Sequence, residues 1–355
     1  MAQEDAPARD TEEPIGNAQS IIQTIIAPGT PDNKRNSEGD VVVLADGTLL
    51  CAWSDFYGGS GDDSGARISA VRSTDGGRTW GERYTIQENV GEQNVMSVSF
   101  LRLQTNELLM FYLVKNSRTD LDLYVRRSTD EAHTWDEATL ITPEPGYYIM
   151  NNARAVQLST RRILCPVSFT QETWTSHENY RTVMYLSDDA GVTWTRGVGL
   201  VSCPKRGAME PGVVELRDGR VLQIIRTQMG KVWHATSADG GDTWTEAEPW
   251  TVVAPEAPST IARIPGTGNL LIIHNPDVDL SAGHSGRRTP LVAAVSADEG
   301  LTWSAPRPIE TDLSATYSYV SITFHQSRAL LTYYVSQGGL NSLKFKSFPM
   351  SLLCN

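Results

Sequence analysis

The sequence predicts an all-β fold, namely a six-bladed β-propeller of four-stranded antiparallel blades that an N-terminal strand closes. Three observations predict it. A turn motif occurs five times, a hairpin pattern occurs six times, and the last hairpin unit lacks a fourth strand that the N-terminus can supply. Repeats at intervals of 50 to 59 residues indicate a modular array, and in an all-β chain such an array is typical of a propeller.

The turn motif has the pattern Ser-x-Asp-x-Gly-x-x-Trp, and only Ala132, where a glycine is expected, departs from it. Its copies begin at Ser73, Ser128, Ser187, Ser237 and Ser296. The Ser and Asp side chains can bond nearby backbone N–H groups, the glycine permits positive φ, and the Trp can pack beneath the turn. The motif is therefore structural and does not by itself indicate a function.

The blade count comes from the hairpins, each an apolar strand, a turn and a second apolar strand. Their turns lie at residues 44–50, 103–109, 158–164, 216–222, 264–271 and 324–331. Asp-Gly between β-rich runs, as in the first and fourth, is a strong hairpin signal. The last unit has no strand after residues 342–348, so we expect the β-rich run over residues 20–26 to close the ring.

Composition fits one propeller domain over residues 20–355. The chain has 355 residues, 40% of them hydrophobic, and no long segment with helical periodicity. The net charge of −12 argues against a nucleic-acid or anionic-membrane partner, and no apolar run reaches transmembrane length. Residues 1–19 are charged and contain proline, which predicts a flexible lead-in. Residues 2–5 resemble the start of a mature chain, which favours a secreted or periplasmic location over a cytoplasmic one.

The four cysteines form no metal-binding pattern. Cys51 and Cys165 occupy matching places on the second strands of blades one and three, which predicts buried free thiols. Cys203 and Cys354 can pair only if the C-terminus folds back, and the sequence leaves that open.

Candidate ligand-binding side chains occur at the strand ends that face the mouth of the propeller channel. They are Arg35, Glu38, Asp62, Asp63, Asn94, Asn152, Arg154, Glu210, Arg226, Arg288, Tyr317 and Tyr319. Taken singly, each is also compatible with a solvated rim residue. Together they bring several arginines, several carboxylates and two tyrosines to one face.

The chain resembles the sialidase (neuraminidase) superfamily over residues 20–350. The repeats contribute to the resemblance, and residues 210–226 match more sharply: Glu210-Pro-Gly-Val-Val-Glu-Leu-Arg-Asp-Gly leads to Arg226 at the end of the next strand. The resemblance implies these roles: a carboxylate clamp of Arg35, Arg226 and Arg288, the nucleophile Tyr319, the base Glu210, and an acid/base Asp at 62 or 63.

These residue types suit a retaining exo-α-sialidase. Three guanidinium groups can bind the carboxylate that sialic acid carries on its anomeric carbon. A neutral tyrosine avoids the repulsion that a carboxylate nucleophile would meet, and a glutamate can take its proton. An aspartic acid can protonate the leaving oxygen. The resemblance thus implies an acidic-sugar glycan as substrate and requires no metal or organic cofactor, while the oligomeric state stays open.

Some assignments stay open on the sequence alone. Asp62 and Asp63 are not separable, although spacing slightly favours Asp63. Tyr317 lies two residues before Tyr319 and shares its face if the strand is regular. Glu38 departs from the family pattern, and Arg154 adds a cation outside the arginine triad. With Asn94 and Asn152 as further candidate contacts, these departures leave room for a different nonulosonic acid.

Two other function classes are also compatible with the sequence. A carbohydrate-binding propeller without turnover would keep the arginines but should lack Tyr, Glu or Asp, and all three are present. A lyase or hydrolase acting on a uronate could use Tyr or His as base, and His284 lies near the proposed site. The products formed from a sialoside distinguish these classes.

Overall fold

The computed structural model describes residues 21–354, so the predicted lead-in over residues 1–19 lies outside the described residues. The described chain is all-β, with one four-residue helix, α1 (Ser351–Cys354), and a 3-10 turn, η2 (Gly283–Ser285). Neither helix of this range is long and apolar enough to cross a membrane.

The strands form four sheets, of eight, ten, four and four strands. Dividing the two larger sheets at their parallel bridges, β26 to β2 and β8 to β10, gives six antiparallel units, numbered here from the N-terminus by their innermost strand. Unit 1 contains β2 (Arg35–Val43), β3 (Leu49–Phe56), β4 (Arg67–Ser73) and β5 (Tyr84–Gln87). Unit 2 contains β6 (Asn94–Arg102), β7 (Leu108–Lys115), β8 (Leu121–Ser128) and β9 (Thr139–Leu140). Unit 3 contains β10 (Tyr147–Ile149), β11 (Val156–Gln157), β12 (Ile163–Thr170), β13 (Arg181–Ser187), β14 (Thr195–Arg196) and β15 (Val201–Ser202).

The other three units complete the list. Unit 4 contains β16 (Met209–Glu215), β17 (Val221–Arg226), β18 (Lys231–Ser237) and β19 (Glu248–Val253). Unit 5 contains β20 (Thr260–Arg263), β21 (Leu270–His274), β22 (Leu291–Ser296) and β23 (Arg307–Glu310). Unit 6 contains β24 (Thr316–His325), β25 (Arg328–Gln337), β26 (Leu340–Pro349) and β1 (Ile22–Ala27). Each hairpin predicted from the sequence lies within one of these units.

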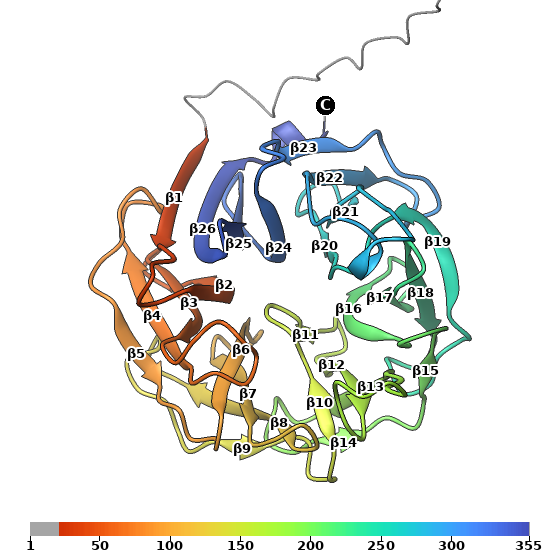
Figure 1. Ribbon diagram of the computed structural model, residues 1–355, viewed down its shortest axis with the longest axis horizontal. Coiled ribbons are helices and arrows are strands. Elements are labelled where there is room, and N and C mark those ends of the chain that lie inside the picture. Colours follow the sequence, from red (N-terminus) through yellow and green to blue (C-terminus); the bar gives the residue numbers. More distant parts are fainter. Residues whose placement is uncertain (1–20, 355) are drawn as a thin grey trace, which may run out of the picture.

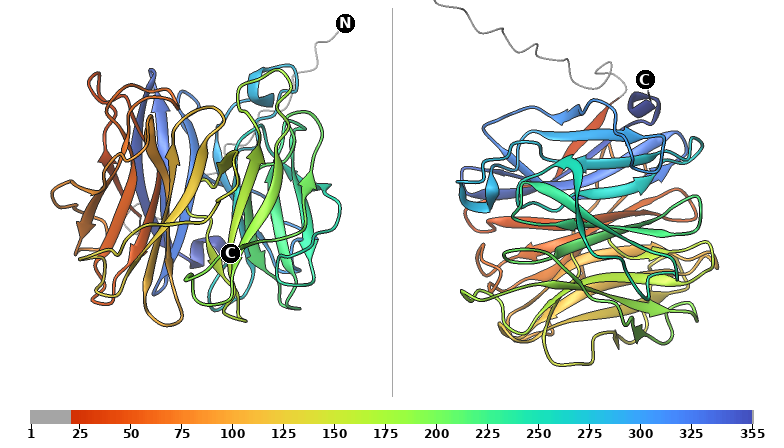
Figure 2. Two further views of the ribbon diagram at one scale, coloured as in Figure 1. Left: turned by 90° about the horizontal axis from the view of Figure 1, so that it is seen from below. Right: turned by 90° about the vertical axis from the view of Figure 1, so that its right-hand side faces the viewer.

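The units are arranged around a central axis (Figure 1). Strands β2, β6, β16, β20 and β24 lie nearest the axis, together with β11, and the later strands of each unit lie farther out. In side view the strands run between the two faces of the molecule (Figure 2). The ends of the inner strands therefore meet at the axis on each face.

Strand β1 joins the first and last parts of the described chain. It pairs antiparallel with β26, from Ile22 opposite Ser347 to Ala27 opposite Leu343. The expectation that the N-terminal strand adds to the last unit is confirmed. A parallel bridge between Arg35 and Asn341 then links that unit to unit 1.

The turn motifs adopt the self-capped conformation predicted from their residues. In the first motif, Ser73 Oγ donates to Asp75 Oδ1 at 2.8 Å. Asp75 Oδ1 also accepts the backbone N–H of Thr79 at 2.9 Å. Ala132 adopts φ 60° in place of a glycine. The Trp80 ring packs edge-on against Phe345 with centroids 5.2 Å apart.

Three cysteines are described at side-chain level. Cys51 and Cys165 are buried free thiols, as predicted. Cys203 is also buried and free. The side chain of Cys354 lies outside the described part of the chain.

Candidate active site

A polar pocket of about 330 Å³ lies where the N-terminal halves of inner strands meet. Most of the residues predicted for the site line it: Arg35, Asp62, Glu210, Arg226, Arg288 and Tyr319. They come from units 1, 4, 5 and 6, so only the tertiary fold brings them together.

Backbone bulges aim several of these side chains. The pairing register of four inner strands shifts near their N-terminal ends, and each shift contains a residue with positive φ. These residues are Glu38 (φ 47°), Ser97 (φ 61°), Glu210 (φ 39°) and Tyr319 (φ 57°). Non-glycine residues rarely adopt this conformation, and bulges commonly re-aim side chains beside active sites. Three of the four carry an ionisable side chain that belongs to the site.

Tyr319 and Glu210 form the centre of the pocket. The Tyr319 hydroxyl donates to Glu210 Oε1 at 2.8 Å, and Arg226 Nη1 donates to Glu210 Oε2 at 2.5 Å. Burial, followed by the negative charge of Glu210, raises the pKa of Tyr319 well above its ordinary value. Burial alone would raise the pKa of Glu210, but the charge and hydrogen bond of Arg226, the charge of Arg288 and the hydrogen bond from Tyr319 together lower it. The free protein thus holds a neutral phenol against a carboxylate.

Arg35 connects two acidic side chains at the pocket edge. Its Nη2 donates to Glu38 Oε1 at 2.7 Å and its Nη1 donates to Asp62 Oδ1 at 2.6 Å. Burial alone would lower the pKa of Arg35, but Glu38 and Asp62 raise it. Burial alone would raise the pKa of Asp62, but Arg35 lowers it. Glu38 is therefore ion-paired with Arg35, a guanidinium that it shares with Asp62.

A buried carboxylate that sequence reasoning missed supports two of the arginines. Glu256 Oε1 lies 3.7 Å from Arg226 Nη2, and the backbone carbonyl of Glu256 accepts from Arg288 Nη2 at 3.2 Å. The second carboxylate oxygen of Glu256, Oε2, lies 3.0 Å from His284 Nδ1. Glu256 stands in the connection between β19 and β20, outside every repeat, so no local signal marks it. Arg288 also donates to the Tyr334 hydroxyl at 2.9 Å.

The wall of the pocket on unit 3 is aromatic. Tyr147, Tyr180 and Trp174 line it, and the buried ammonium of Lys115 lies 4.3 Å from the Trp174 ring centroid. Burial lowers the pKa of Lys115 to about 8. The same ammonium donates to the backbone carbonyl of Asp62 at 3.0 Å. Sequence reasoning missed this wall, whose aromatic residues lie in the short strand β10 and in the connection between β12 and β13.

The bulge in β24 separates the two candidate tyrosines. The prediction that Tyr317 shares a face with Tyr319 is wrong, because the register shifts between Ser318 and Ser321. Tyr317 is buried in the hydrophobic core against Tyr333, with its hydroxyl on the backbone carbonyl of Asp312. It does not line the pocket.

The structure also separates the two adjacent aspartates. Both aspartates are exposed, but Asp62 lines the pocket and binds Arg35, whereas Asp63 does not line it. The position of Asp63 therefore does not support the slight preference, drawn from spacing, for Asp63 as the acid/base residue. Asn94, from the next unit, holds this loop, because its Nδ2 donates to the Asp62 carbonyl at 2.8 Å and to the Ser64 carbonyl at 2.9 Å. Asn94 thus fixes this loop and is buried rather than lining the pocket.

Asn152 and Arg154, predicted to contact substrate, lie outside the pocket lining. Both are buried beneath it, in the connection between β10 and β11. Arg154 Nε donates to Asn151 Oδ1 at 2.8 Å and its Nη2 donates to the Ser259 carbonyl at 2.9 Å. Burial lowers the pKa of Arg154 to about 10.

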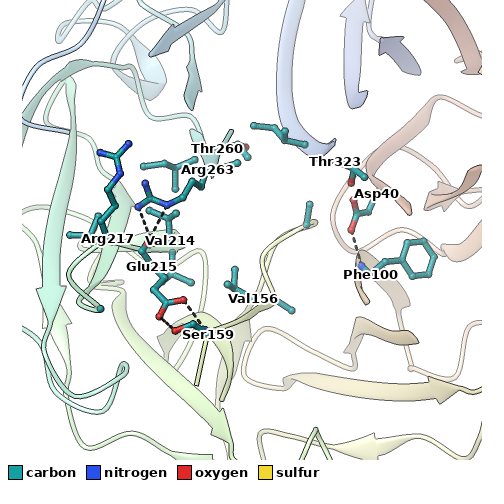
Figure 3. Close-up of a pocket in the computed structure, with 18 residues that line it drawn as sticks. Asp40, Phe100, Val156, Ser159, Val214, Glu215, Arg217, Thr260, Arg263 and Thr323 are labelled. Carbon is teal, nitrogen blue, oxygen red and sulfur yellow. Dashed lines mark hydrogen bonds between the residues drawn. The ribbon is translucent and has the colours of Figure 1, made fainter. Parts of the chain in front are cut away.

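A larger cavity, about 620 Å³, is formed by the C-terminal halves of the inner strands (Figure 3). Its polar groups already bond one another. Glu215 accepts from Ser159, Arg263 pairs with Glu299, and Asp40 accepts the backbone N–H of Phe100 at 2.7 Å. Burial raises the pKa of Asp40 to about 7. The smaller pocket gathers four arginines around the Tyr319–Glu210 pair, so it is the better candidate for chemistry.

The fold places the protein among the β-propeller-type all-β proteins. A solved structure of Trypanosoma rangeli sialidase in complex with sialic acid is similar, with a TM-score of 0.75 and 16% sequence identity. The similarity covers 94% of this chain and 59% of that one. A family model described as a BNR repeat-like domain matches residues 47–330. The chain belongs to this family.

Curated relatives confirm the predicted resemblance to the sialidase superfamily. A sialidase from Paraclostridium sordellii is 28% identical over 234 residues, covering 58% of this chain and 56% of the relative. A sialidase from Micromonospora viridifaciens is 26% identical over 326 residues, covering 80% of this chain and 47% of the relative. The chain thus spans about half the length of the curated relatives it matches.

Proposed function

We propose that the protein is a sialidase-like glycoside hydrolase that releases a terminal sialic acid, or a related nonulosonic acid, from glycoconjugates with retention of anomeric configuration. The observation that carries the proposal is the hydrogen bond between Tyr319 and Glu210 inside a pocket that Arg35, Arg226 and Arg288 line. Membership of the BNR repeat-like family and sialidase relatives support it.

We also infer that the six units form a complete six-bladed propeller closed by β1. The pairing of β1 with β26 supports this inference. So does the composition of the pocket, which takes residues from both ends of the described chain.

In this proposal the arginines bind the carboxylate of the sugar. Guanidinium groups recognise carboxylates through charge-assisted, planar hydrogen bonds. Arg288 is held by Tyr334 and by the Glu256 backbone, so its guanidinium is oriented before substrate arrives. The ion pair of Arg35 with Glu38 reduces the repulsion that a free carboxylate would exert on an anionic sugar.

The first chemical step forms a bond between the Tyr319 oxygen and the anomeric carbon. Glu210 accepts the phenolic proton, and the bond to the leaving oxygen breaks as Asp62 protonates that oxygen. In the second step Asp62 takes a proton from water, the water oxygen bonds to the anomeric carbon, and Tyr319 leaves with the proton that Glu210 returns. Two inversions give net retention.

Substrate binding would raise the pKa of both catalytic carboxyl groups, and the chemistry needs this rise. In the free protein Arg226 lowers the pKa of Glu210, and Arg35 lowers the pKa of Asp62. When these arginines bind the sugar carboxylate, part of their charge is neutralised, so both pKa values rise. Glu210 then becomes a stronger base, and Asp62 holds the proton that it must donate.

The test is the product formed from a fluorogenic α-sialoside, followed by proton NMR in the first minutes. Retention predicts that the α-anomer of the free sugar appears before mutarotation produces the β-anomer. Initial β-anomer would contradict the retaining mechanism. An unsaturated sugar would indicate elimination, and binding without product would indicate a carbohydrate-binding protein, so either result would contradict the proposed hydrolysis.

A further inference from the structure

The connection between β10 and β11 lies between the two axial cavities. Ile149 lines the active-site pocket, whereas Ala153 and Ala155 line the larger cavity. The connection is anchored on other units. Ala153 N donates to the Val98 carbonyl at 3.3 Å and Arg154 N donates to Ser99 Oγ at 2.8 Å, both on β6. The connection therefore crosses the axis as a fixed floor for the pocket.

The side-chain amide of Asn152, in this floor, bonds two other units. Its Nδ2 donates to the Gly39 carbonyl on β2 at 2.6 Å and to the Tyr319 carbonyl on β24 at 2.9 Å. Asn152 is fully buried, and its Oδ1 has no hydrogen-bond partner among the described residues. The amide is thus arranged for its two donors, one for each carbonyl.

Both carbonyls belong to bulges that present site residues. Tyr319 itself has φ 57°, and Gly39 directly follows Glu38, which has φ 47°. These conformations are strained for side chains with a Cβ and persist only where the surroundings hold them. An amide that binds both carbonyls fixes the direction in which Tyr319 leaves the backbone. The amide also holds the backbone of Tyr319 at a fixed position relative to β2, the strand that carries Arg35 and Glu38.

We propose that Asn152 is a positioning residue for the reaction: through these two hydrogen bonds it holds the bulges of β24 and β2 so that the Tyr319 hydroxyl stays on Glu210. The inference rests on the proposed function, because it takes Tyr319 as the nucleophile. It replaces the expectation that Asn152 contacts substrate. The amide acts on the backbone from beneath the pocket and leaves the arginines to bind the sugar.

The experiment compares Asn152→Ala with Gln223→Ala in the full chain. Gln223 is a matched control, since it is also a fully buried amide with one unpartnered oxygen among the described residues, and it bonds Thr182 at 2.9 Å outside the pocket. The measurements are kcat and KM on a fluorogenic sialoside, the melting temperature, and the crystallographic distance from Tyr319 Oη to Glu210 Oε1. If Asn152→Ala does not fold, Asn152→Ser, which keeps one donor, takes its place.

We expect both variants to melt at lower temperature but only the Asn152 variant to lose turnover. A misplaced nucleophile predicts a loss in kcat of about 100-fold, with KM changed by no more than about threefold because the arginines remain. The Tyr319–Glu210 distance should lengthen beyond 2.8 Å. Parental kcat and distance in the Asn152 variant, or an equal kcat loss in Gln223→Ala, would overturn the positioning role. If the parent hydrolyses no sialoside, the proposed function fails, and the Tyr319–Glu210 distance alone decides whether Asn152 positions the tyrosine.

Discussion

The hydroxyl of Tyr319 lies 2.8 Å from Oε1 of Glu210, and both residues have positive φ at a register shift in an inner strand. The two bulges lie on units 6 and 4, so neither local sequence nor a regular strand explains the contact. The backbone N–H of Glu210 donates to Ser168 Oγ at 3.2 Å, which helps hold its bulge. A conformation that is unfavourable at two positions is thus maintained where it aims a phenol at a carboxylate.

Exchanging each adjacent aspartate separately tests which one is the acid/base. We expect Asp62→Asn to lower turnover of a sialoside with a poor leaving group by about 100-fold or more, because protonation of that group is lost. Asp63→Asn should stay near the parental rate, since Asp63 lies outside the pocket lining. Steady-state kinetics on a sialoside whose leaving group is a natural disaccharide measure turnover by both variants. A large loss in Asp63→Asn alone would reverse the assignment.

Removing one arginine tests whether the smaller pocket binds the sugar carboxylate. In Arg226→Ala a buried charge-assisted contact is lost, which typically amounts to about 2–5 kcal/mol. We therefore expect kcat/KM to fall by roughly 30-fold to several thousandfold. Arg217→Ala is the control, because Arg217 lines the larger cavity and pairs with Glu299. If Arg217→Ala lost activity and Arg226→Ala did not, the site would lie in the other cavity.

Glu256 predicts a pH dependence of stability. Burial alone would raise its pKa, but the hydrogen bond from His284 and the charges of Arg226 and Arg206 lower it to about 2 from an ordinary 4.5. A carboxyl group whose pKa is lower when folded stabilises the protein fully above its unfolded pKa, and this stabilisation disappears as pH falls through the folded pKa. The melting temperature of the parent should therefore exceed that of Glu256→Gln most at pH 6 and progressively less from pH 4.5 towards 2. A difference that does not change with pH would contradict this.

Truncation tests the contribution of β1. Deleting residues 1–27 removes the partner of β26 and exposes the edge of that strand. We expect a clearly lower melting temperature and increased aggregation, because unpaired edges associate with other chains. Deleting residues 1–20 leaves β1 in place and should change the melting temperature little. Equal melting temperatures for both truncated chains would show that β1 does not stabilise the last unit.

Much of the fold was predictable because its signals are local. The Ser73 turn and the Asp-Gly hairpin at Asp46 fix their own backbone through nearby hydrogen bonds, so short stretches of sequence define them. The place of β1 followed from counting strands. The base candidate Glu210 and the clamp residue Arg226 were predicted because they lie on one hairpin with a spacing that resembles the family pattern.

The remaining site residues depend on features that no short stretch of sequence encodes. A regular strand would have put Tyr317 beside Tyr319, and only the bulge separates them. The choice of Asp62 over Asp63 depends on contacts from Asn94, which belongs to the next unit. Asn152 was predicted to lie near the site, but its position beneath the pocket follows from how the units pack around the axis.

Trapping the covalent intermediate tests the central claim, that Tyr319 is the nucleophile, most directly. The parent protein and Tyr319→Phe are incubated with 2,3-difluorosialic acid, and peptide mass spectrometry locates the adduct. We predict an adduct on Tyr319 in the parent, no adduct in Tyr319→Phe, and a similar melting temperature for both, because the variant removes only the hydroxyl. An adduct on any other residue, or near-parental turnover by Tyr319→Phe, would contradict the account.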